Sequence, residues 1–121
     1  MCGIAGVFNL NGEPFSMGYL KKMAEVIAHR GPDGEGFWIN ENKTAGLGHR
    51  RLAIIDLSAQ SNQPFTDNSG RYVLVFNGEI YNYIELKAEL QNQYDFKTES
   101  DTEVLLAAYI VYGKECLQKC N

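Results

Sequence analysis

Cys2 is the residue whose type and position most clearly suggest chemistry, because it stands one peptide bond from the amino terminus. A terminal amine has a pKa of about 7.7 to 8.0, so part of it is neutral at physiological pH and can accept a proton. If Met1 is removed, which a small second residue permits, Cys2 combines a thiol nucleophile and its general base in one residue. Alternatively, Cys2 is only a small apolar residue in a buried strand, since free cysteines are among the most buried residues.

The dipeptide Asn77-Gly78 is a second candidate, because it follows the most apolar stretch of the chain. A side-chain amide beside a glycine, whose backbone N–H is not shielded by a Cβ, offers two donors to a developing oxyanion. An ordinary Asn-Gly turn is the alternative reading. A hairpin turn leads into a second strand, however, whereas the residues after Glu79 predict a helix.

Charged residues at three further positions can bind a small charged substrate. Arg50 and Arg51 lie among apolar residues, where alternation places them on opposite faces of a strand. An inward arginine needs a carboxylate, either from the protein or from a substrate. With Arg51 on an α-carboxylate and Glu79 and Asp101 near an α-amino group, the three residues can hold a free amino acid. Each of them can equally be a solvated surface residue.

A metal site is not predicted. Cys116 and Cys120 are four residues apart and can share a helical face, and Cys2, His29 and His49 are the other soft ligands. A structural zinc site usually has a second closely spaced ligand pair, which this sequence lacks.

Composition narrows the class of protein. The chain has 121 residues, the size of one domain, with 45% hydrophobic residues, 21% charged residues and a formal charge of -4. Its lysines and arginines are scattered, so we expect no nucleic-acid partner. No apolar run approaches the ~20 residues of a membrane span, and the first residues do not resemble a signal peptide. We therefore expect a cytoplasmic protein with no membrane partner.

The elements that must position these residues are predicted as strands first and helices afterwards, which indicates the α+β class with helices packed on an antiparallel sheet. We expect a loop at 29–36 and another at 58–70. Strands are predicted at residues 2–8 (buried), 37–39, 44–49, 51–55 and 71–76 (central, buried on both faces).

Three amphipathic helices are predicted. The first covers residues 17–29 and is capped by Ser16, and the second covers about 82–91. The third follows Ser100, with Glu103 at the capping-box position. The inner sides of the second and third are expected to consist of Ile84, Leu86, Ala88 and Leu90, and of Val104, Leu105, Ala108 and Tyr109, respectively.

Five sequence blocks occur in the order and at the spacing of a known family. The chain resembles class II glutamine amidotransferases, and most of all the amino-terminal glutaminase domain of glutamine-hydrolysing asparagine synthetases, as far as about Tyr112. The blocks are Met1 to Gly6, His29 to Asp33, Gly48 to Leu52, Gln63-Pro64 and Asn77 to Asn82.

The resemblance implies an αββα sandwich of the amino-terminal nucleophile hydrolases, with two antiparallel sheets between layers of helices. It implies hydrolysis of glutamine to glutamate and ammonia through a thioester, with no cofactor for this step. The residues it implies for the site are the nucleophile Cys2 with its freed amine as base, the oxyanion donors Asn77 and Gly78, Arg51 for the α-carboxylate, Glu79 and Asp101 around the α-amino group, and backbone atoms of Ile54 and Ile55. For the block at His29 to Asp33 we expect a structural or gating role only.

The chain also departs from the family pattern. Ala53 stands where serine is common, and Ser61-Asn62 replaces a common Gly-His. Family domains continue beyond the residue that matches Asn121, so we expect 1–121 to be a partial glutaminase domain. The C-terminal strands and the synthetase domain, which binds ATP and Mg²⁺, are then absent.

Three expectations follow for such a partial domain. It should have little activity alone, it should cover its open sheet by forming a homodimer, and in the intact protein its ammonia should pass to the synthetase domain. Two alternatives remain open: a non-catalytic domain of the same fold that binds an amino acid or a partner, and an amidotransferase whose acceptor is not aspartate.

Overall fold

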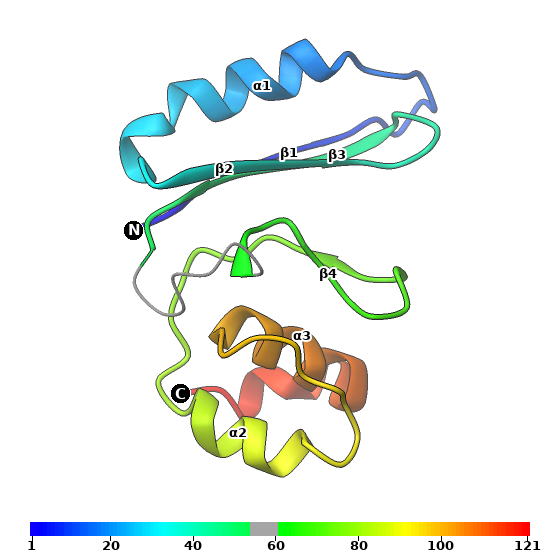
Figure 1. Cartoon of the computed structure of the whole chain (residues 1–121). Helices are drawn as coiled ribbons and strands as arrows, with labels where there is room; N and C mark the ends of the chain where they lie inside the picture. The colour runs from blue at the N-terminus through cyan, green and yellow to red at the C-terminus, as the bar shows by residue number, and fades with distance from the viewer. Residues whose placement is uncertain (54–60) are drawn as a thin grey trace. The chain divides into compact units, whose positions relative to one another are not determined.

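A computed structural model describes residues 1–53 and 61–121 of the chain (Figure 1). These residues form two compact units. The first unit comprises residues 1–53, 62–64 and 75–77, and the described part of the second comprises Ser61 and residues 65–74 and 78–121. The structure is of mixed helix and sheet, which confirms the α+β class.

The first unit is built on a three-stranded antiparallel sheet in the order β1-β3-β2. Its strands are β1 (Gly3–Phe8), β2 (Gly34–Ile39) and β3 (Ala45–Arg51). In the register, Gly3 pairs with Arg50, and Gly34 pairs with Arg51. β2 and β3 form a hairpin whose turn is closed by the Asn40 side chain, which accepts hydrogen bonds from the backbone N–H groups of Thr44 and Ala45. The sheet therefore places the beginning of β1 beside the end of β3.

Helix α1 (Met17–Val26) covers one face of this sheet (Figure 1). The predicted cap is confirmed, because Ser16 Oγ accepts a hydrogen bond from the Tyr19 N–H. Leu20 is fully buried, and the helix approaches β3 closely at Gly46, where a Cβ would lie 3.1 Å from Leu20 Cδ2. The helix ends earlier than predicted, and a short 3-10 helix, η1 (Ala28–Arg30), follows it.

Several strand predictions need correction. β1 begins at Gly3 and is not buried throughout, because its face opposite α1 leaves Ile4 48% and Phe8 71% exposed. β2 begins at Gly34, so the preceding loop is shorter than expected. The two strands predicted at 44–49 and 51–55 are one continuous strand as far as Arg51, and Leu52 and Ala53 lie outside it. Ile54 and Ile55 lie outside the described residues.

The second unit contains a short antiparallel pair, β4 (Phe65–Thr66) and β5 (Val73–Leu74). The turn between them lies in the predicted loop, and Gly70 adopts a φ of 71° there. The prediction of a central strand over 71–76 is wrong, because only Val73 and Leu74 are paired and both are half-buried. The pairing stops by Phe76, whose N–H donates to a side chain rather than to a neighbouring strand.

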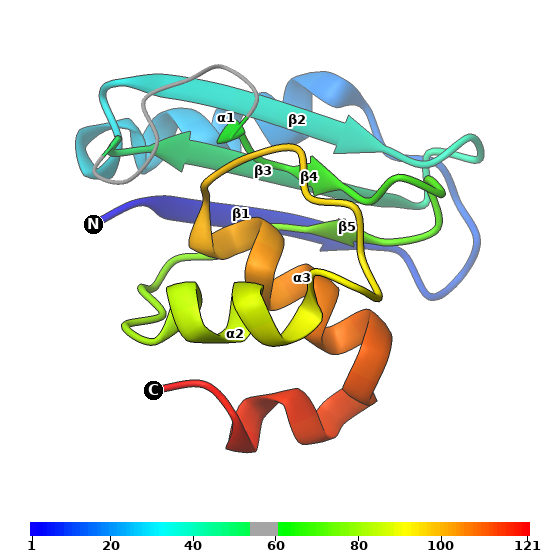
Figure 2. The ribbon, with the colours of Figure 1, turned by 60° about the horizontal axis from the view of Figure 1, so that its bottom comes forward.

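Helices α2 (Tyr83–Leu90) and α3 (Asp101–Tyr112), with the 3-10 helix η3 (Gly113–Gln118), complete the second unit (Figure 2). Gly113 ends α3 with a φ of 62°, which favours glycine. A buried core joins these helices and consists of Leu90, Ala107, Ala108 and Cys116, with Tyr94, Phe96, Val111 and Tyr112 packed around it.

The helix positions are confirmed, but their inner faces are partly different. Leu86 and Leu90 are buried in α2, whereas Ile84 is 65% exposed and Ala88 is exposed. Residues four apart share a helical face, while a residue two positions away points to the opposite side. Burial of Leu86 and Leu90 therefore turns Ile84 and Ala88 away from the core. In α3, Tyr109 is 46% exposed.

The predicted capping box of α3 is also wrong. Ser100 Oγ accepts a hydrogen bond from the Thr102 N–H, so Ser100 does cap the helix. Glu103 does not reach back to the Ser100 N–H, which donates to Thr98 Oγ1 instead. The fully buried Glu103 carboxylate accepts from the backbone N–H groups of Lys97 and Thr98 and from the Thr98 hydroxyl.

Candidate functional site

The half-buried thiol of Cys2 is held at the end of the sheet of the first unit. Cys2 Sγ accepts a hydrogen bond from the Leu52 N–H at 3.3 Å and lies 3.7 Å from the Leu52 carbonyl oxygen. Arg30 Nε donates to the Cys2 carbonyl oxygen at 3.1 Å. The backbone and the side chain of Cys2 are thus both fixed by residues distant in sequence.

The loop after η1 is hydrogen-bonded to the end of β3 and to the residues that follow it. The Asp33 N–H donates to the Arg51 carbonyl oxygen at 3.0 Å, and Asp33 Oδ2 accepts from the Ala53 N–H at 2.9 Å. The loop approaches β3 so closely that a Cβ on Gly31 would lie 2.3 Å from the Arg50 carbonyl carbon. A side chain at that position would push the loop away from β3.

Arg51 lies on the face of the sheet opposite α1. Arg50 points toward α1, where its Nε donates to the Ala24 carbonyl oxygen and its guanidinium pairs with Glu35 at 2.9 Å. Because successive side chains alternate, Arg51 points the other way, which confirms the predicted alternation. The pairing of Gly3 with Arg50, continued by one residue, places Cys2 opposite Arg51 on the same face.

Two neighbouring polar side chains, Asn62 and Gln63, reach the candidate residues of the first unit. Asn62 Oδ1 accepts a hydrogen bond from Arg51 Nη1 at 2.6 Å. Gln63 Oε1 accepts from the Phe76 N–H at 2.5 Å, immediately before the half-buried Asn77. The first unit therefore contains three of the predicted residues: Cys2, Arg51 and Asn77.

Three other predicted residues belong to the second unit: Gly78, Glu79 and Asp101. Asp101 begins α3 and is 7% exposed, and its Oδ2 accepts a hydrogen bond from the Ile80 N–H at 3.1 Å. This bond fixes the backbone that follows Gly78 and Glu79, both of which are exposed. The second unit thus brings Asp101 close to the residue after Glu79.

The first unit thus contains a cysteine at the second position, an arginine on the same face of the sheet and an amide at Asn77. The family model for the glutamine amidotransferase domain matches residues 1–121. The chain belongs to this family.

Relatives of this glutamine amidotransferase domain include asparagine synthetase [glutamine-hydrolyzing] 1 of Bacillus subtilis, at 46% identity over 98% of the chain and 19% of the relative. Asparagine synthetase B [glutamine-hydrolyzing] of Escherichia coli is 42% identical over 97% of the chain and 21% of the relative. Amidase chry2 of Gibberella zeae is 43% identical over 93% of the chain and 18% of the relative. The chain therefore spans about a fifth of the length of these relatives.

His49 is a buried histidine of the amidotransferase domain, for which the sequence suggested no role except as a possible metal ligand. It is 1% exposed, and among the described residues neither ring nitrogen has a hydrogen-bond partner of good geometry. Burial lowers the pKa of His49 below its ordinary value, the Phe76 backbone opposes this effect, and the charge of Arg51 adds to it. The alternation along β3 could have placed His49 on the face of Arg51, but nothing local to the sequence indicates its burial.

The contacts of Asn62 and Gln63 make them functional candidates that sequence reasoning missed, although Gln63-Pro64 is one of the five sequence blocks. Polar residues before a proline indicate a loop and nothing about their partners. Their contacts form only because the segment 62–64 lies against β2 at Gly36, where a Cβ would be 2.1 Å from the Gln63 carbonyl oxygen.

The described residues contain no cluster of three or more His, Cys, Asp or Glu side chains able to hold a metal ion. In the second unit, Cys120 Sγ donates to the Cys116 carbonyl oxygen at 3.3 Å, and burial raises the pKa of both thiols. Within the part of the chain that the structure describes, no helix is long and apolar enough to cross a membrane.

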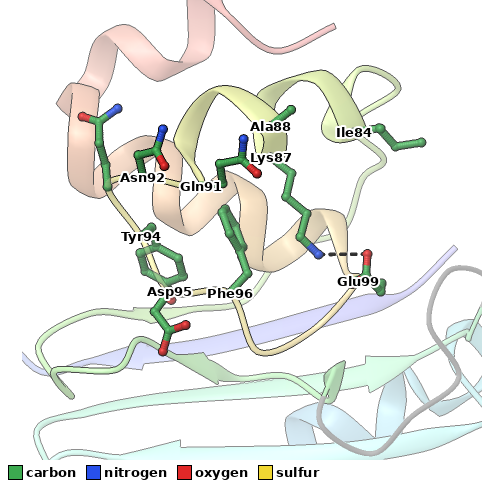
Figure 3. Close-up of a pocket in the computed structure, with 10 residues that line it drawn as sticks. Ile84, Lys87, Ala88, Gln91, Asn92, Tyr94, Asp95, Phe96 and Glu99 are labelled. Carbon is green, nitrogen blue, oxygen red and sulfur yellow. Dashed lines mark ion pairs between the residues drawn. The ribbon is translucent and has the colours of Figure 1, made fainter.

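A separate surface pocket of about 650 Å³ lies beside α2 in the second unit (Figure 3). Lys87 pairs there with Glu99 at 2.8 Å and lies over the Phe96 ring, against which Tyr94 packs. Burial, followed by the charge of Glu103, raises the pKa of Tyr94 to about 12. None of the predicted site residues lines this pocket.

Proposed function

We propose that this glutamine amidotransferase domain hydrolyses the side-chain amide of glutamine to glutamate and ammonia, with Cys2 as the nucleophile. The observation that carries the proposal is the placement of the Cys2 thiol on the same sheet face as Arg51, one residue from the amino terminus. The family match and the names of the glutamine-hydrolysing relatives support it.

The chemistry begins when the freed Cys2 amine takes the thiol proton and the sulfur adds to the amide carbon. Asn77 and Gly78 donate hydrogen bonds to the oxyanion that forms. The carbon–nitrogen bond then breaks, and the nitrogen leaves as ammonia with the proton from the amine. Water adds to the thioester with the amine again as base, the carbon–sulfur bond breaks, and the thiol recovers its proton.

Substrate binding follows the charges of the free amino acid. Arg51 pairs with the α-carboxylate, because a guanidinium presents parallel donors to a planar carboxylate. Glu79 and Asp101 bind the α-amino group, and Ile54 and Ile55 contribute backbone atoms. The two antiparallel sheets, each found with helices of its own unit, support the proposal of an αββα sandwich of the amino-terminal nucleophile hydrolases. We propose no cofactor for this step.

In the intact protein, we propose that the ammonia passes to an ATP- and Mg²⁺-dependent synthetase domain that makes asparagine in the cytoplasm. The printed names of the asparagine synthetase relatives support this acceptor. An amidotransferase whose acceptor is not aspartate is the alternative, and one relative, Amidase chry2, is not named as an asparagine synthetase. We also propose that the protein forms a homodimer.

The proposal predicts that a glutamine analogue with a chloroketone in place of its amide will label Cys2 covalently. The sulfur first adds to the ketone carbon as the amine takes the thiol proton, which forms an oxyanion like that of glutamine hydrolysis. The carbonyl then re-forms as the sulfur moves to the adjacent carbon and displaces chloride. Labelling is measured by mass spectrometry, which also shows whether Met1 has been removed. We expect Cys2→Ala to abolish labelling and a form that retains Met1 to react at least about tenfold more slowly, because its amine is acylated and cannot act as base.

Cys120→Ala is the matched control, since Cys120 is a half-buried thiol in the other unit and should not change the rate. If the form with a free Cys2 amine is not labelled at Cys2, the proposed hydrolysis is wrong. That result would favour a non-catalytic domain that binds an amino acid.

A further inference from the structure

We infer that Asn62 and Gln63 are two positioning residues with separate tasks, Asn62 orienting Arg51 for the substrate carboxylate and Gln63 fixing the backbone that presents Asn77. The inference rests on the proposed function, which assigns Arg51 and Asn77 their roles. Neither residue touches the reacting atoms in this assignment.

The Asn62 contact is with a charged group and is geometrically defined. Arg51 can only donate, so the atom of Asn62 that lies 2.6 Å from Nη1 is its carbonyl oxygen. A guanidinium carries five N–H donors in one plane, so it can bind Asn62 and a carboxylate together. The bond to Asn62 restrains the rotation of that plane. Asn62 itself is exposed, which places this contact at the accessible side of Arg51.

The Gln63 contact acts on the backbone. A backbone N–H can only donate, so the atom that lies 2.5 Å from the Phe76 N–H is the Gln63 carbonyl oxygen Oε1. Gln63 is 8% exposed, and its own backbone lies against β2 at Gly36 with no room for a Cβ. The Phe76 amide is therefore tied to the sheet through Gln63, and Asn77 is the next residue.

The two residues are adjacent in sequence, yet they address opposite ends of the proposed substrate. Asn62 acts on the group that binds the α-carboxylate, whereas Gln63 acts on the group that stabilises the oxyanion. Loss of Asn62 should weaken binding of the ground state, and loss of Gln63 should slow the chemical step. The two variants are thus distinguished by which kinetic constant changes.

The test uses the chloroketone analogue on protein with a free Cys2 amine and separates its binding constant from its maximal labelling rate. We expect Asn62→Ala to weaken binding about 3- to 10-fold with an unchanged maximal rate, which is the effect of one typical intramolecular hydrogen bond. We expect Gln63→Leu to lower the maximal rate about tenfold or more with unchanged binding. Gln63→Glu keeps the acceptor oxygen and should restore most of the rate.

Asn42→Ala and Gln118→Leu are matched controls, because both residues are exposed. Asn42 lies in the β2–β3 turn, at the other end of β3 from Arg51, and Gln118 belongs to the second unit. Neither control should change either constant. Equal changes in both constants for Asn62→Ala and Gln63→Leu, or no change in either variant, would overturn the inference.

A second measurement keeps the two proposals distinguishable. Hydrogen exchange of the Phe76 amide should be faster in Gln63→Leu than in wild type and should stay slow in Gln63→Glu, whether or not Cys2 reacts. If exchange changes in this way but Cys2 is never labelled, the proposed function fails while the structural task of Gln63 stands. Unchanged exchange in Gln63→Leu would overturn the task of Gln63.

Discussion

His49 illustrates how one buried residue couples the candidate site to pH. Its side chain lies on the same face of β3 as Arg51, in contact with the backbone that leads to Asn77. Burial and the positive charge of Arg51 both favour the neutral imidazole. Protonation of His49 would place a second positive charge next to the residue proposed to bind the glutamine carboxylate.

The lowered pKa of His49 predicts a pH-dependent stability. The unfolded chain, in which the pKa is about 6.5, binds a proton at a higher pH than the folded chain does. The stabilising contribution is therefore complete above pH 6.5 and is lost as the pH falls from there through the lower pKa of the folded state. Urea unfolding at a series of pH values should show this loss in wild type and a smaller loss in His49→Phe and His49→Gln.

His29→Gln is the control for this experiment, because His29 is the other histidine of the chain and is exposed. It should keep the slope of the wild type. The explanation would be wrong if both His49 variants lost as much free energy of unfolding as the wild type when the pH falls below 6.5. Using two variants separates the loss of a titrating group from an effect of side-chain volume.

At the scale of single elements, Glu103 stabilises the loop before α3 rather than the cap of the helix. Its fully buried carboxylate accepts hydrogen bonds from the Lys97 and Thr98 N–H groups and from the Thr98 hydroxyl. Removal of the carboxylate leaves the two buried Thr98 donors and the partly buried Lys97 N–H without this acceptor, which costs more than the bonds contribute. Ser100 supplies the cap separately through its bond from Thr102.

A double-mutant cycle can test this division of roles. We expect Glu103→Ala to lower the free energy of unfolding by at least about 3 kcal/mol, and Ser100→Ala by about 1 kcal/mol. The two effects should add within about 0.5 kcal/mol, since their side chains share no hydrogen bond. Glu103→Ala and Thr98→Val should instead show a coupling of about 1 kcal/mol or more. Strong coupling between Ser100 and Glu103 would contradict this division and support the capping box instead.

The elements that sequence predicted well are those with local signals. The helices α1, α2 and α3 were located within a few residues, because periodic apolar residues and the caps Ser16 and Ser100 act over one or two turns. The strand predicted at 71–76 failed, because the extent of a strand depends on a partner elsewhere in the chain, and β4 provides only two residues.

The same distinction applies to the candidate site. The opposite directions of Arg50 and Arg51 were predictable, because alternation is a property of any strand. The partners of Asn62 and Gln63 were not predictable, because these contacts form only when the segment 62–64 meets Arg51 at the end of β3 and Phe76 in the segment 75–77. The resemblance supplied residue roles, but it could not supply these contacts.

At the scale of the whole chain, the two units are interleaved in sequence. The chain passes between them after residues 53, 61, 64, 74 and 77. The β4–β5 hairpin of the second unit is therefore bounded on both sides by segments of the first unit, Asn62–Pro64 and Val75–Asn77. Unfolding of one unit removes the anchors of segments that belong to the other, so the two should unfold in one cooperative transition.

This predicts coincident unfolding curves for probes in different units. Trp38, the single tryptophan, lies in β2 and reports the first unit by fluorescence. Circular dichroism reports mainly the second, whose helices α2 and α3 have 8 and 12 residues against 10 in α1. Leu90 is fully buried in the second unit, so Leu90→Ala should cost about 2–5 kcal/mol and lower both midpoints equally.

Leu20→Ala is the reciprocal variant, because Leu20 is a fully buried residue of α1 that packs against β3 in the first unit. It should shift the circular dichroism midpoint as far as it shifts the Trp38 fluorescence midpoint. If Leu90→Ala lowered the circular dichroism midpoint and left the Trp38 midpoint unchanged, the units would unfold independently. The contacts of Asn62 with Arg51 and of Gln63 with Phe76 lie within the first unit. They would then not depend on whether the β4–β5 hairpin is folded.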